Sequence, residues 1–102
     1  MEEYYKKAYQ SYVDEWGLDA QLLMAIEEMS ELTKEICKYM RYNSFESGNK
    51  EKLEKTIAQL KSEIADVLNT TEQLQYCFGI EEIEKIRKEK IERTNKLLKG
   101  KE

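Results

Sequence analysis

The chain has 102 residues, of which 37% are charged, and its formal net charge is −4 at pH 7. It contains no histidine, which excludes Ser-His and Cys-His nucleophile systems, imidazole acid–base catalysis and the usual zinc sites. The sequence has no basic block suited to nucleic-acid phosphates, no apolar run of the roughly 20 residues that span a bilayer, and a start too polar for a signal peptide. We therefore expect a cytoplasmic protein that binds neither nucleic acid nor membrane, folded as one domain over residues 1–102.

Four helices are predicted from apolar residues spaced three or four apart. Proline is absent and glycine occurs only four times, which indicates an all-α protein. Gly17 ends the first predicted helix, Asp19 is the expected N-cap of the second, and "NSFESGN" separates the second from the third. Because short connections favour antiparallel neighbours, the expected architecture is a four-helix antiparallel bundle. The predicted helices cover residues 2–16, 19–40, 50–77 and 81–98.

Two acidic residues lie three positions apart in each of the two middle helices. Glu28 and Glu31 belong to "AIEEMSEL", and Glu63 and Asp66 belong to "SEIADVL". At about 100° per residue, the first acid of each pair lies about 80° from the centre of its helix's apolar stripe, and the second about 140° to the same side. If the two helices pack antiparallel through these stripes, all four carboxylates emerge on one edge.

Four converging carboxylates repel one another unless a cation neutralises them. Hard divalent ions prefer oxygen ligands, and Mg²⁺ typically keeps positions for water and for substrate phosphates. The spacing therefore favours a magnesium site. The alternative from the same residues is that all four acids belong to solvated helix faces, where glutamate is usually found.

The two acidic segments also resemble a known family. "EEMSEL" at residues 27–32 and "EIADVL" at residues 63–68 are similar to the ExxE and ExxD motifs of the MazG-like all-α nucleoside triphosphate pyrophosphohydrolases, relatives of the dimeric dUTPases. The likeness covers about residues 16–98. It implies a MazG-like domain and a hydrolase acting on acid anhydrides, which cleaves a nucleoside triphosphate at the α-phosphorus to monophosphate and pyrophosphate. The implied cofactor is Mg²⁺, with Mn²⁺ as a substitute.

The resemblance implies roles for five acids. Glu28, Glu31, Glu63 and Asp66 match the metal ligands of the family. Glu27 precedes the first motif, and with Glu28 it forms the candidate catalytic pair, as a group that supports the ligands or accepts a proton from water. Because a metal ion lowers the pKa of bound water and a carboxylate accepts the proton, this chemistry needs no histidine.

Family members carry a lysine and an asparagine in the last helix, facing the phosphates. The matching stretch "RKEKIERTNKLLKG" offers Lys90, Asn95 and Lys96, with a lysine-to-asparagine spacing one residue longer than in the relatives. Lys90 and Arg87 lie within about 40° of Ile83 on the helical wheel, inside the apolar stripe, where a basic group requires an anion. The alternative is that both side chains extend out of the stripe or pair with nearby glutamates.

Several other residues have two interpretations. Trp16 and Tyr12 either stack on a nucleobase or form core or subunit contacts. Cys37 and Cys77 are expected to be small buried hydrophobic residues rather than a disulfide.

The small size of the chain, together with apolar residues such as Met24 outside the main stripe, predicts a homodimer or homotetramer. Two other functions remain open. One is a non-catalytic helical bundle that binds a partner, and the other is a pyrophosphohydrolase of another metabolite such as a phosphoribosyl nucleotide. The residues do not indicate which base or sugar is preferred.

Overall fold

The computed structural model describes residues 1–45 and 48–100, and this part of the chain is almost entirely helical, with no strand. The all-α prediction is confirmed, and no helix bound differs from the predicted one by more than one residue. The helices are α1 (Glu3–Trp16), α2 (Leu18–Met40), a short π-helical turn η1 (Arg41–Phe45), α3 (Lys50–Phe78) and α4 (Ile80–Lys99).

Two glycines make the sharp connections between helices. Gly17 between α1 and α2 has φ +85°, and Gly79 between α3 and α4 has φ +129°, values that side chains other than glycine rarely adopt. Gly17 itself precedes α2, so the prediction of Asp19 as the N-cap is wrong, and Asp19 lies in the first helical turn. Asn49 caps α3, where its side chain accepts a hydrogen bond from the Lys52 backbone N–H at 3.2 Å. Of the predicted break before α3, residues 46 and 47 lie outside the described residues.

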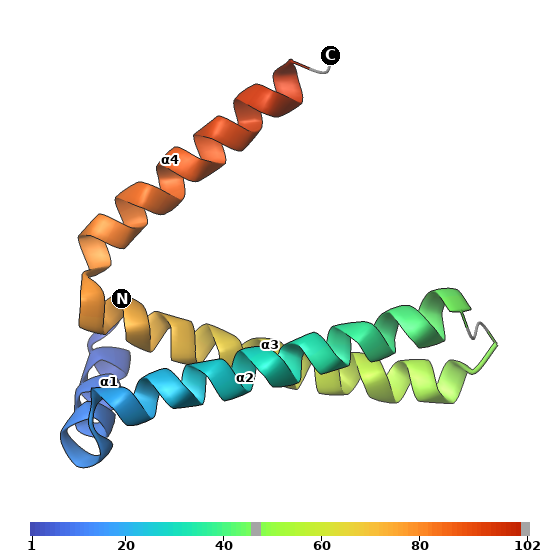
Figure 1. The fold of residues 1–102 in the computed structure, drawn as a ribbon, viewed down its shortest axis with the longest axis horizontal. Coiled ribbons are helices and arrows are strands. Elements are labelled where there is room, and N and C mark those ends of the chain that lie inside the picture. The colour runs from blue at the N-terminus through green and yellow to red at the C-terminus, as the bar shows by residue number, and fades with distance from the viewer. Residues whose placement is uncertain (46–47, 101–102) are drawn as a thin grey trace.

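Helices α2 and α3 form an antiparallel hairpin that is the longest feature of the molecule (Figure 1). The fully buried residues of these two helices are small or polar rather than large and apolar. They are Gln21, Ala25 and Glu35 on α2, and Thr56, Glu63 and Gln73 on α3. Ala25 is only 1% exposed, which shows how closely the helices approach one another.

The apolar stripes of the hairpin are only partly covered: Leu22, Leu32 and Ile57 are half-buried, but other members of the α2 stripe are more exposed. Ile26, Met29, Ile36 and Met40 of α2 are each 42% to 57% exposed. The chain itself therefore leaves much of the surface of these four side chains uncovered. Periodicity indicates that one side of a helix is apolar, but it does not say which surface covers that side. Cys37, expected to be buried, is exposed as well.

Helix α1 crosses the end of the hairpin and is held there by two hydrogen bonds to α3 (Figure 1). The Tyr9 hydroxyl donates to Glu72 Oε1 at 3.1 Å, and the Tyr76 hydroxyl donates to Gln10 Oε1 at 2.6 Å. Tyr9 is 4% exposed. Burial raises the pKa of Tyr9, and the neighbouring Glu72 carboxylate raises it further, so the hydroxyl stays protonated as a donor.

Replacing Tyr9 by phenylalanine removes the hydroxyl, so the Glu72 carboxylate loses the hydrogen bond that this hydroxyl donates. We expect Tyr9→Phe to lower the free energy of unfolding by about 1.5–3 kcal/mol in urea titrations, since hydrogen bonds to charged groups contribute that much. Tyr4→Phe is the matched control, because Tyr4 is 77% exposed. Equal midpoints for the two variants would show that the Tyr9 hydroxyl does not hold α1 in place.

Helix α4 leaves the same end of the hairpin and diverges from it, so that the two form an open V (Figure 1). It contacts the end of α3 but does not contact α2. None of the α4 residues is buried. The structure therefore does not confirm a four-helix bundle within one chain. Within the described residues, no helix is both long and apolar enough to cross a membrane. The cytoplasmic location stays a prediction.

Candidate metal centre

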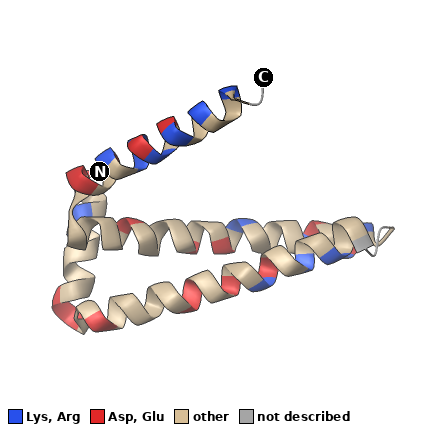
Figure 2. Ribbon diagram, turned by 45° about the horizontal axis from the view of Figure 1, so that its top comes forward, with Lys and Arg blue, Asp and Glu red and all other residues tan. Residues whose placement is uncertain are grey.

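The antiparallel hairpin brings three of the four predicted ligands together. Glu28 of α2 and Glu63 and Asp66 of α3 each offer one carboxylate oxygen, and these atoms lie within 4.8 Å of one another. The three-residue spacing of Glu63 and Asp66 puts both on one face of α3, and Glu28 approaches from the opposing helix. Figure 2 shows acidic residues in the middle of the hairpin, away from its turn.

Glu63 is the most enclosed member of the cluster. It is 8% exposed, and its Oε1 accepts a hydrogen bond from Gln59 Nε2 at 2.9 Å. Its other oxygen, Oε2, is buried and has no hydrogen-bond partner among the described residues. A buried carboxylate oxygen without a hydrogen-bond donor lowers the stability of the fold, because it has lost its hydrogen bonds to water and has formed none with the protein. This atom is the one whose surroundings best fit a bound cation.

Glu28 is half-buried, and its neighbours act against its charge. Burial raises the pKa of Glu28, and the negative charges of Asp66 and Glu63 raise it further. The carboxylates of Glu28, Glu63 and Asp66 therefore repel one another, and binding of either a proton or a cation relieves this repulsion.

The shifted pKa of Glu28 predicts how stability depends on pH when divalent ions are removed. Since the folded-state pKa lies above the ordinary value of 4.5, the contribution of Glu28 to stability is fully present below 4.5 and is lost as the pH rises through the folded value. In EDTA, we expect the urea midpoint of Glu28→Gln to exceed that of the wild type by more at pH 7 than near pH 4.5. A difference that does not change with pH would contradict the repulsion.

The other two acids of the first motif lie outside the cluster. Glu31, one turn further along α2, and Glu27, beside Glu28, are both exposed. Glu31 is not among the three residues whose oxygens converge. Its prediction as a ligand is thus neither supported by this geometry nor excluded by it, since its exposed side chain lies one turn from Glu28.

Two residues of the site escaped the sequence analysis. Gln59 holds one oxygen of Glu63, and the four-residue spacing between them is the signal that identifies it. Glu35, seven residues after Glu28 on the same face, is 5% exposed and pairs with Lys38 at 3.4 Å. Glu35 thus has a cation from its own helix, whereas Glu63 has none among the described residues.

The predicted phosphate-binding residues do not join the acids within one chain. Lys90, Asn95 and Lys96 are exposed on α4, which diverges from the hairpin (Figure 1). The candidate stacking residues Trp16 and Tyr12 are exposed on α1, with ring centroids 5.9 Å apart, and neither is part of a core.

Comparison with protein-family models, with curated proteins and with solved structures finds no match to this chain. The resemblance to the MazG-like family therefore stays a prediction carried by the two motifs alone.

Proposed function

We propose that the protein is a Mg²⁺-dependent nucleotide pyrophosphohydrolase, which cleaves a nucleoside triphosphate at the α-phosphorus. The observation that carries the proposal is the buried Oε2 of Glu63, an acceptor without a donor in a cluster with Glu28 and Asp66. The first acidic motif contributes to this cluster from α2, and the second contributes from α3. They are also the segments that resemble the MazG-like family.

The donor set fits a hard divalent ion such as Mg²⁺ or Mn²⁺ better than it fits a soft metal. Glu28, Glu63 and Asp66 offer only carboxylate oxygens, and no histidine or cysteine belongs to the cluster. Their distance of up to 4.8 Å from one another leaves room for an ion between them. The contrast with Glu35 supports the assignment, because the chain neutralises that buried acid with a lysine and provides none for Glu63.

Each residue of the site then has a role in the reaction. Glu28, Glu63 and Asp66 would hold the ion, and Gln59 fixes the orientation of Glu63. When bound, Mg²⁺ supplies charge neutralisation at the phosphate oxygens and makes a water easier to deprotonate. Glu27, exposed beside this cluster, accepts the proton of the attacking water. The new bond joins the water oxygen to the α-phosphorus, and the bond to the β-phosphate oxygen breaks to release pyrophosphate.

A panel of nucleotides tests the proposal. The purified protein is incubated with each common and several non-standard nucleoside triphosphates and Mg²⁺, and pyrophosphate, orthophosphate and monophosphate are measured. We expect equal amounts of pyrophosphate and monophosphate, with a ranking among the bases. Orthophosphate as the product, or no release with either Mg²⁺ or Mn²⁺, would contradict the proposal. Hydrolysis of a phosphoribosyl nucleotide alone would instead favour another pyrophosphate-containing metabolite as the substrate.

A further inference from the structure

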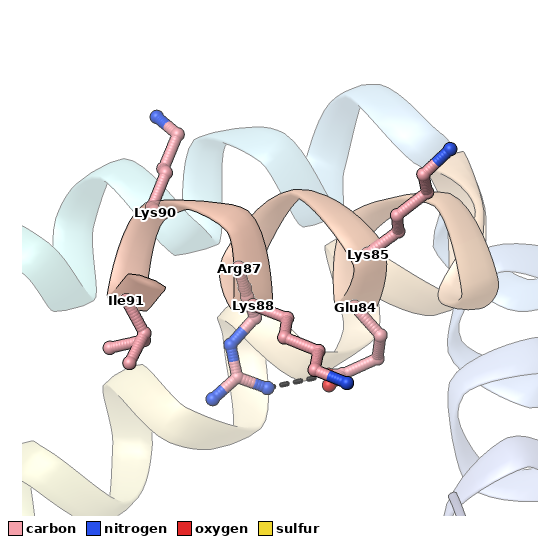
Figure 3. A pocket seen from close by; sticks show the side chains of 6 residues that line it. All are labelled: Glu84, Lys85, Arg87, Lys88, Lys90 and Ile91. Carbon is pink, nitrogen blue, oxygen red and sulfur yellow. Dashed lines mark hydrogen bonds and ion pairs between the residues drawn. The ribbon is translucent and has the colours of Figure 1, made fainter. Parts of the chain in front are cut away.

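Glu63 is held by a neutral donor, unlike the acids that form ion pairs. Each of the four ion pairs among the described residues joins an acid to a lysine or arginine three or four positions away on the same helix. Figure 3 shows one of them, between Glu84 and Arg87 of α4. The partner of Glu63 is instead the amide of Gln59, whose Nε2 donates to Glu63 Oε1 at 2.9 Å. This hydrogen bond orients Glu63 without neutralising its charge.

The same hydrogen bond makes the two oxygens of Glu63 unequal. Oε1 accepts from Gln59, whereas Oε2 is buried and has no partner among the described residues. The N–H groups of an amide carry partial positive charge, and they repel a cation that approaches the oxygen to which they donate. Glu63 therefore presents one oxygen, Oε2, to an ion.

The position of Gln59 makes this arrangement independent of the neighbouring helices. Gln59 lies four residues before Glu63, so the two side chains are one turn apart on the same face of α3. Gln59 is exposed, whereas Glu63 is buried. Since both residues belong to one helix, a change in the distance between α2 and α3 does not break their hydrogen bond.

The number of available oxygens separates Mg²⁺ from Ca²⁺. Mg²⁺ takes about six ligands in near-octahedral geometry and keeps several waters, whereas Ca²⁺ takes about six to eight oxygens and accepts both oxygens of one carboxylate. With one oxygen each, Glu28, Glu63 and Asp66 provide three ligands. This set leaves the remaining positions of Mg²⁺ to water and phosphate, but it supplies fewer than half of the oxygens that Ca²⁺ prefers.

We propose that Gln59 is a positioning residue that makes the acidic cluster select Mg²⁺ over Ca²⁺, because its hydrogen bond keeps one oxygen of Glu63 away from the ion. The inference rests on the metal centre of the proposed function, and it adds the residue that decides which divalent ion this centre accepts. Without the donor, Glu63 is free to offer both oxygens. The site then gains a ligand for Ca²⁺ and loses the fixed orientation that suits Mg²⁺.

Titration with Mg²⁺ or Ca²⁺ alone, without nucleotide, tests this selection. Gln59→Met keeps a side chain of similar length and helix propensity but removes the donor. After dialysis against EDTA, the dissociation constant of each ion is measured by isothermal titration calorimetry. We expect the ratio of the Ca²⁺ constant to the Mg²⁺ constant to fall about tenfold or more in Gln59→Met, since residues that orient metal ligands typically change metal affinity by about 10–100-fold. An unchanged ratio, with both affinities lowered equally, would overturn the proposal.

Two further variants separate the lost hydrogen bond from the new side chain. Ala58→Met is the matched control, because Ala58 is exposed and lies about 100° around the helix from Gln59. It should keep the wild-type ratio, and an equal shift in this variant would contradict a specific role for Gln59. Gln59→Ala also lacks the donor and should reproduce the shift. A wild-type ratio in Gln59→Ala would contradict the proposal as well.

The same titrations distinguish failure of this inference from failure of the proposed function. A wild type that binds Ca²⁺ as tightly as Mg²⁺ would overturn the selection and leave nucleotide hydrolysis untouched. A wild type that binds neither ion would overturn the metal centre, and with it both proposals. Selective Mg²⁺ binding that Gln59→Met loses, in a protein that hydrolyses no nucleotide, would count against the proposed function and not against the selection.

Discussion

Glu63→Gln is expected to abolish Mg²⁺-dependent turnover while the protein stays folded. The substitution keeps the shape of the side chain and its neighbour Gln59, but it removes the negative charge of the most enclosed carboxylate in the cluster. Loss of a single well-placed group at a metal or transition-state site typically costs about 100-fold or more. We therefore expect a decrease of at least about 100-fold in the rate of pyrophosphate release, measured at saturating Mg²⁺.

Glu54→Gln on the same helix is the matched control, because Glu54 is exposed and belongs to no ion pair or cluster among the described residues. Circular dichroism should give the same helix content for both variants. In EDTA, the melting temperature of Glu63→Gln should equal or exceed that of the wild type, because a buried negative charge has been removed. If Glu63→Gln fails to fold, or turns over as fast as Glu54→Gln, Glu63 is a structural residue and not a ligand.

Addition of Mg²⁺ or Mn²⁺ is expected to raise the melting temperature of the wild type by a large amount. An ion that binds only the folded state stabilises by mass action, by about 2.7 kcal/mol at 100 times the dissociation constant. For a chain of this size, each kcal/mol corresponds to roughly 4–8 °C, so the expected increase is about 10–20 °C. The measurement is a thermal scan with increasing metal after dialysis against EDTA.

Two variants show whether the stabilising ion binds at the acidic cluster. Glu63→Gln should lose most of the increase, and Glu54→Gln should retain it. An identical melting temperature with and without metal would leave a non-catalytic helical bundle as the better interpretation, because a folded-state metal site must stabilise the protein. A shift that is equally large in Glu63→Gln would place the ion elsewhere on the acidic surface.

The helices and the antiparallel pairing of α2 with α3 could be predicted from the sequence, but the residues buried within the hairpin could not. Spacing of apolar residues, the absence of proline and the glycines at the turns locate all four helices to within one residue at each end. The seam of the hairpin, however, is lined by Gln21, Ala25 and Thr56, which no hydrophobic pattern selects. Periodicity also does not predict that Ile26 of α2 and Ile64 of α3 stay exposed. It identifies the apolar side of a helix, but it does not identify the surface that covers that side.

The candidate site was predictable to the extent that it depends on local spacing. Three-residue spacing and an antiparallel pair suffice to bring Glu28, Glu63 and Asp66 together. The buried Glu35 with its partner Lys38 was missed, because a single acid on a helix has no distinctive spacing. The placement of Lys90 far from the acids of its own chain depends on the direction in which α4 leaves Gly79, which a short turn sequence does not determine.

Hydrolysis in water enriched in oxygen-18 tests the central claim most directly. The products of the best nucleotide from the panel are separated and weighed by mass spectrometry, with Glu63→Gln run in parallel. Attack of water at the α-phosphorus predicts one labelled oxygen in the nucleoside monophosphate and none in pyrophosphate. Label in pyrophosphate or orthophosphate, or products that Glu63→Gln forms at the wild-type rate, would contradict the account.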